Sequence, residues 1–359
     1  MSYYGSSLAL QSDDQMKQEL KNKAPVPWIG MYVAAASLVC SLAMAADLFH
    51  GFRHKKLWFP CKFFTLNAGT LTLLAVAMKL PIYISTAMPT KADQLAKLSS
   101  TIFMSTAMGN LMPSLGTMDD REILMNLTAL GILVITIFVN VCIQLHTGLL
   151  SNFLVIEHIA VMLFMLVLLV ILSFSALTVP TTKKHMQLKY AGMHKLASSE
   201  ELEETEKFTF DALKRDVKKY WMLAETSSPQ FVMARSMTSS AAGAICFLTT
   251  FILVEASLKM IRHPRYSRYF SYPPNTISDY GVSTVFIYHI QRIGVLVGTI
   301  AQVFRWFIAA KLRLSEKICK TYKTEMKTEN YWIARLVGWK EGRLCHAPKI
   351  LKKPSIYTN

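Results

Sequence analysis

Two long apolar runs, ILMNLTALGILVITIFVNVCIQL (residues 123–145) and FLVIEHIAVMLFMLVLLVILSFSAL (residues 153–177), decide the fold of this chain. Each run exceeds the roughly 20 apolar residues needed to cross a hydrocarbon core of about 30 Å. No lysine or arginine occurs between Arg121 and Lys183, and two such consecutive runs are not expected in a soluble protein. The sequence therefore predicts two membrane-spanning helices joined by a tight turn.

The composition agrees with a multi-pass membrane protein. Of the 359 residues, 52% are hydrophobic and only 17% are charged. The net charge of +16 could suggest a nucleic-acid partner. We predict no such partner, because lysine and arginine also gather in cytosolic segments, where they set orientation and meet anionic lipids.

Five further candidate spans flank these two runs, and they predict an all-α, polytopic membrane helix bundle of about seven spans. The weakest candidate contains Ser, Thr, Asn110 and Pro113, so six spans plus a re-entrant segment is the alternative. Before the span at 123–145, Asp119 and Glu122 predict a capping box at the start of the helix. The five candidates are residues 27–49, 57–78, 98–115, 236–260 and 281–310.

The chain is divided by charge as well as by hydropathy. Basic residues are most frequent in the long polar segment after Pro180 and in the tail, which places both in the cytosol. The predicted parts are a polar N-terminal segment (1–26), the first five membrane segments (27–180), a cytosolic loop with an amphipathic helix (181–235), the last two spans (236–310) and a basic cytosolic tail (311–359).

The last span carries a polar stripe. Its polar side chains fall within about 140° on a helical wheel, with Gly294 and Gly298 beside them as a GxxxG pair for close helix packing. One face of this helix is therefore expected to meet protein or water. The polar side chains are Gln291, Arg292, Thr299, Gln302 and Arg305.

Charged residues inside spans predict an intramembrane polar cluster of Glu157, Glu255, His289 and Arg292. Arg292 lies near the predicted bilayer middle, and both glutamates lie in the outer halves of their spans. A buried arginine needs a partner, so we predict contact between Arg292 and at least one of these carboxylates. Two interpretations stay open: a polar vestibule or ion path, and a structural ion pair that only holds helices together.

Other motifs predict less. Asp47, His50 and His54 share one helical face, but a metal enzyme would need further histidine clusters, so we predict no metal site and no cofactor. The six cysteines have no CxxC spacing, which argues against zinc and disulfides. Cys61 and Cys319 lie near predicted membrane ends, where reversible acylation is an option.

Two stretches have the pattern of interfacial helices, residues 208–223 and 331–339. Packing of these stretches on the bundle is the alternative. We also expect the basic tail to bind anionic lipids. In the first span, Ser37, Ser41 and Ala45 recur every four residues, which predicts a closely packed neighbouring helix.

Three stretches taken together, residues 92–148, 219–236 and 293–309, resemble a land-plant family of uncharacterised multi-pass membrane proteins. The resemblance covers most of the chain and implies a plant source. Members of that family tend to be longer, which implies a short member or a truncated chain. The resemblance implies no activity, substrate or catalytic residue.

The sequence therefore predicts an integral protein of the plasma membrane or an endomembrane, with the lipid bilayer as its first partner. The leading function is a non-enzymatic transport or channel-like component. The alternatives are a scaffold or assembly partner that acts through the cytosolic loop and tail, and a membrane-embedded lipid enzyme. The chain could form a homo- or hetero-oligomer.

Overall fold

The computed structural model describes residues 25–53, 61–83, 91–148, 154–203, 230, 233, 236–262, 280 and 282–318. Within these residues the chain forms helices and short connections, with no strand. The elements are α2 (Val26–Arg53), α3 (Ala68–Ala77), α4 (Lys79–Ile82), α5 (Lys91–Leu111), the 3-10 helix η1 (Met112–Thr117), α6 (Asp120–His146), α7 (Val155–Glu203), α10 (Met237–Arg262) and α11 (Ser283–Ile318).

Among the described residues, five helices are long and apolar enough to cross a membrane, which confirms the prediction of an all-helical membrane protein. They include both runs that opened the sequence analysis. The sequence predicted about seven spans, and α3 and α5 are not among these five. The five candidate spans are Val26–Arg53, Asp120–His146, Val155–Thr181, Met237–Arg262 and Ser283–Phe307.

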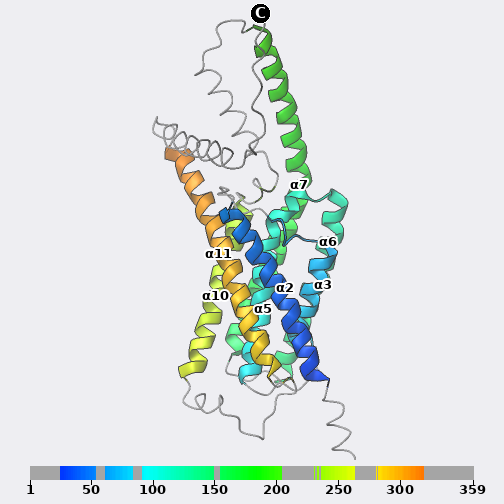
Figure 1. Cartoon of the computed structure of the whole chain (residues 1–359), viewed down its shortest axis with the longest axis vertical. Coiled ribbons are helices and arrows are strands. Elements are labelled where there is room, and N and C mark those ends of the chain that lie inside the picture. The colour runs from blue at the N-terminus through cyan, green and yellow to red at the C-terminus, as the bar shows by residue number, and fades with distance from the viewer. Residues whose placement is uncertain are drawn as a thin grey trace, which may run out of the picture. The chain divides into compact units, whose positions relative to one another are not determined.

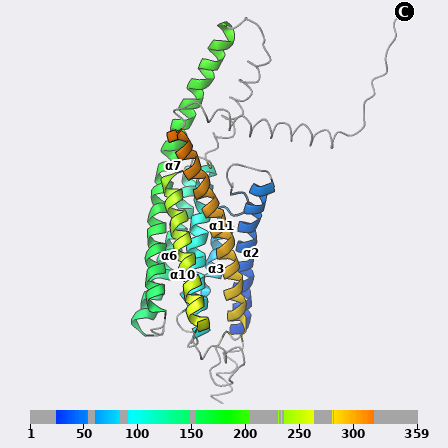
Figure 2. The same ribbon diagram turned by 90° about the vertical axis from the view of Figure 1, so that its left-hand side faces the viewer.

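Contacts at the two ends of the bundle fix the course of the chain between α2 and α6. At one end, the start of α5 meets the end of α6, where Lys97 bonds to Gln144, and Gln144 also bonds to Pro81 of α4. At the other end, the Leu66 N–H before α3 donates to Ser114 of η1. The unit α3–α4 therefore runs one way and α5 returns the other way, packed against α7 and α10 (Figures 1 and 2).

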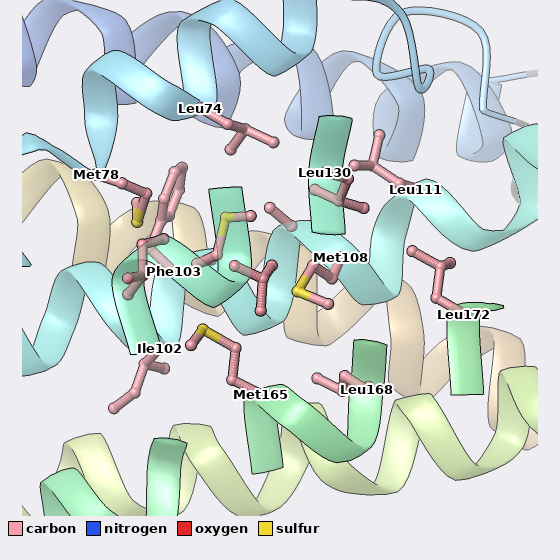
Figure 3. Close-up of a cluster of buried hydrophobic side chains, with 14 of the residues drawn as sticks. Leu74, Met78, Ile102, Phe103, Met108, Leu111, Leu130, Met165, Leu168 and Leu172 are labelled. Carbon is pink, nitrogen blue, oxygen red and sulfur yellow. The ribbon is translucent and has the colours of Figure 1, made fainter. Parts of the chain in front are cut away.

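Helix α5 is enclosed by its neighbours. Ala92 is half-buried, and every residue from 93 to 116 is buried. Its apolar side chains Ile102, Phe103 and Met108 pack with residues of α3, α6 and α7, as Figure 3 shows. The segment at 98–115 scored poorly on hydropathy because its surroundings are protein and not lipid. It is one continuous helix to Leu111, followed by η1, and not a broken one.

Several predicted boundaries were wrong. The span at 57–78 begins late, because residues 61–67 are irregular and Asn67 caps α3 with a capping box to Thr70. Asp119 is the N-cap of α6 as predicted, but its side chain makes no capping bond. Helices α7 and α11 continue past the predicted spans to Glu203 and Ile318. The predicted interfacial helices at 208–223 and 331–339 lie outside the described residues.

Candidate functional site

Polar side chains occupy α5 along its whole length and around its circumference. A helix surrounded by other helices could be filled by apolar side chains at lower cost, since each buried polar group needs a partner. The residues form three levels of contacts, one at each end of α5 and one between them. The buried polar residues of α5 are Asp93, Gln94, Lys97, Ser99, Ser100, Thr101, Ser105, Thr106 and Asn110.

The middle level joins four helices through Gln291 of α11, which is fully buried. Its Oε1 accepts a hydrogen bond from Ser100 of α5 at 2.8 Å. Its Nε2 donates to Ser37 of α2 at 3.1 Å and to the Ala77 carbonyl of α3 at 3.3 Å. All three of these amide contacts are internal to the bundle, so this level is closed.

The level at the start of α5 contains a buried lysine and a buried histidine. The Lys97 ammonium donates to Gln144 Oε1 at 3.0 Å, and Gln144 Nε2 donates to the Pro81 carbonyl at 3.0 Å. His158 of α7 is 1% exposed and lies beside Lys97 and Gln94. The charge of Asp93, one turn earlier on α5, acts on Lys97. This level therefore holds a buried lysine with an acidic residue one turn away, and a buried histidine.

The level at the end of α5 is built around Arg305 of α11, which is 4% exposed. Its Nη1 donates to Asn110 Oδ1 at 3.2 Å, and its Nη2 contacts Cys61 Sγ at 3.5 Å. Burial raises the pKa of the Cys61 thiol to about 11, so the thiol is neutral and is no counter-ion for the guanidinium. Buried in this way, Cys61 is also a poor site for the predicted acylation; Cys319 lies outside the described residues.

The carboxylate of Asp47, at the end of α2, lies in the same region and binds the backbone before α3. It accepts the N–H groups of Lys62, Phe63 and Phe64 at 2.8, 2.8 and 2.9 Å. These charge-assisted hydrogen bonds hold residues 62–64 against the end of α2. Asp47 thus anchors the irregular segment that precedes α3.

Asp47, His50 and His54, which share one helical face in the sequence, were not predicted to bind a metal. The His50 ring lies 6.2 Å from the Phe63 ring, and His54 lies outside the described residues. In the part of the chain that is described, no group of three potential metal ligands occurs.

Arg292 was predicted to contact Glu157 or Glu255, but the basic residue that contacts them is a different one. Lys259 of α10 takes that place, with its ammonium 2.5 Å from Glu157 Oε1 and 3.0 Å from Glu255 Oε1. Arg292 and His289 are exposed on the outer surface of α11. The structure therefore brings together two of the four predicted residues, Glu157 and Glu255, and separates the other two from them.

Gly294 and Gly298 lie where α11 packs closely against α2 and α5. A Cβ at Gly294 would lie 2.3 Å from Ser41 Oγ and 2.6 Å from Phe103. A Cβ at Gly298 would lie 2.5 Å from Thr106 Cγ2 and 2.7 Å from Asn110 Nδ2. Ser41 belongs to the small-residue stripe of the first span, which does meet a close neighbour.

Arg305 was overlooked in favour of Arg292, although the sequence contained a signal. Gln291, Gly294, Gly298, Gln302 and Arg305 follow one another at spacings of three and four, as the buried face of one helix requires. Arg292 breaks this spacing. The spacing of the buried face points to Arg305. The prediction chose Arg292 because of its expected depth in the bilayer.

Comparisons of this chain with family models, with curated proteins and with solved structures found no match.

Proposed function

We propose that this integral membrane protein conducts or transports a small polar solute or ion along α5. The observation that carries the proposal is the enclosed polar helix itself, with a buried basic residue near each end, Lys97 of α5 and Arg305 of α11, each bonded to a neutral amide. Buried charge inside a membrane is costly and is retained mainly where it lines a pathway or binds a ligand. A bundle that needed only stability could fill these positions with apolar residues.

The proposal includes two further crossings, α3–α4 and α5. At 1.5 Å per residue, the 21 residues of α5 measure about 32 Å, which matches a hydrocarbon core of about 30 Å. With these two, the chain crosses seven times, and the basic bias of the long loop and tail puts the C-terminus in the cytosol. A protease-accessible tag after Asn359 in intact cells would contradict this orientation.

Flux through reconstituted vesicles tests the transport proposal. Purified protein in liposomes should dissipate an imposed gradient of K⁺, Na⁺, H⁺ or Cl⁻, followed with a voltage-sensitive dye, faster than protein-free liposomes do. Gln291→Leu, in the middle level, should slow the dissipation strongly. Arg292→Leu, its neighbour on the exposed surface, is the matched control and should not. Equal rates for wild-type and empty vesicles with all four ions would contradict transport of small ions.

A scaffold is the second candidate, favoured by the closed middle level, where every amide contact of Gln291 is satisfied inside the bundle. Inert vesicles together with co-purification of a stoichiometric partner would favour it. The membrane-embedded lipid enzyme, the basic tail as an anionic-lipid ligand, and membership of the plant family remain proposals for which the described residues supply no further support.

A further inference from the structure

We infer that Arg305 and Gln302 form a binding site for a small inorganic anion, of the size of chloride or nitrate, near the end of α5. This inference deepens the proposed transport function by naming a substrate class, and it rests on that function only in this respect. Binding is tested separately from flux.

The first argument is the unfilled hydrogen-bonding capacity of the two side chains. Gln302 is 1% exposed, yet neither its Nε2 nor its Oε1 has a partner. The Nε–H of Arg305 is likewise buried and without a partner. Buried polar groups are almost always satisfied, because an unsatisfied one has lost its hydrogen bonds to water without gaining others. Two such side chains one turn apart on a single helix face indicate a missing ligand between or beside them.

The second argument is charge. Within the described residues no carboxylate lies within 4.0 Å of Arg305, and its two bonded partners, Asn110 and Cys61, are neutral. The Asp47 carboxylate acts on Cys61 as Arg305 does, but its two oxygens accept three backbone N–H groups and not the guanidinium. The guanidinium therefore has no anionic partner in direct contact, and a bound anion would supply one.

The third argument is donor geometry and size. The Arg305 Nε–H and the two Gln302 amide hydrogens are donors, and free donors select an anion over a cation. Gln302 lies against Gly109, where an added Cβ would be 3.4 Å from Gln302 Nε2 and 2.7 Å from Cys246 Sγ. Gln302 therefore lies in a closely packed region between α5 and α10, where a small ion is favoured over a bulky one such as gluconate.

The test uses the full chain in detergent at constant ionic strength, with sodium gluconate replaced stepwise by sodium chloride or sodium nitrate. Wild type should show a rise in Tm of a few degrees that saturates with anion concentration, because the ligand binds the folded state. Gln302→Leu should lose this response while remaining folded, since it removes an unpartnered amide. Arg305→Gln should lose it as well. Arg292→Gln, on the exposed surface, is the control and should keep it.

The same Tm in gluconate, chloride and nitrate for wild type would overturn the inference, as would a full response in Gln302→Leu. A response to anionic lipid added to the detergent, with none to chloride or nitrate, would also overturn it, because a lipid phosphate would then be the ligand. A saturating Tm response in a protein that carries no flux would leave the site in place and would contradict transport alone.

Discussion

Helices α5 and α6 lie side by side in the sequence and face opposite surroundings. Only six of the 27 residues of α6 are buried, and Leu124, Met125 and Ile132 are exposed. Helix α5 is less apolar and is buried along nearly all of its length. In a soluble protein the more apolar helix would be inside. In a membrane, the exposed apolar side chains of α6 can face lipid. The buried helix α5 can then carry small and polar side chains that pack and form hydrogen bonds with its neighbours.

The largest expected contrast is between two glycines, one in the interior and one facing outward. Gly298→Val should destabilise the bundle by about 3 kcal/mol, because its side chain overlaps Thr106 and Asn110. Gly131→Val in α6 should change stability by less than about 0.5 kcal/mol, because nothing lies within 4 Å of its Cβ position. Unfolding can be followed with a thiol-reactive dye, since Cys40, Cys61 and Cys246 are buried. Equal losses would erase the contrast.

The next contrast is between two aspartates. Asp47→Asn should cost about 2 kcal/mol, because an amide offers one acceptor oxygen to three backbone N–H groups and turns donors toward the rest. Asp119→Asn is the control, because its side chain is exposed and makes no capping bond. The measurement is the Tm of each variant. Similar shifts for both would mean that Asp47 does not anchor the segment before α3.

The smallest contrast lies within one ion-pair cluster. The Glu157 side chain is 8% exposed and that of Glu255 is 48% exposed, and both contact Lys259. Glu157→Gln should lower stability by roughly 1 kcal/mol and Glu255→Gln by less, since exposed ion pairs contribute little. Lys259→Met with each glutamine variant completes two double-mutant cycles. A larger coupling energy for Glu255 would reverse the assignment of the inner partner.

Hydropathy predicted the outer helices well, because α6 and α7 must match the lipid around them. It failed at α5, where burial by protein removes the need for apolar residues. It also failed at residues 61–67, because the three N–H groups that Asp47 accepts are visible only once the chain has turned back on itself. The small-residue pattern of Ser37, Ser41, Gly294 and Gly298 was readable from spacing alone.

The cation contacts could not be predicted from depth. Arg292 and Arg305 occupy the same helix, and only their angular positions decide which one enters the bundle. Lys259 lies near the end of the predicted span at 236–260, and its long side chain reaches both Glu157 and Glu255. Pairing of charges between helices depends on rotation about each helix axis, which a single sequence specifies only through regular spacing such as that of Gly298, Gln302 and Arg305.

Labelling from within the lipid tests the central claim, that α5 is a polar helix enclosed by other helices. A lipid-soluble diazirine, activated by light in proteoliposomes, inserts into any side chain that lipid reaches, and mass spectrometry locates the products. We predict strong labelling of α6 at Ile132 and Ile135, which are 63% and 54% exposed, and none of α5 between Leu98 and Leu111. Labelling of α5 at the level of α6 would contradict the enclosed polar helix.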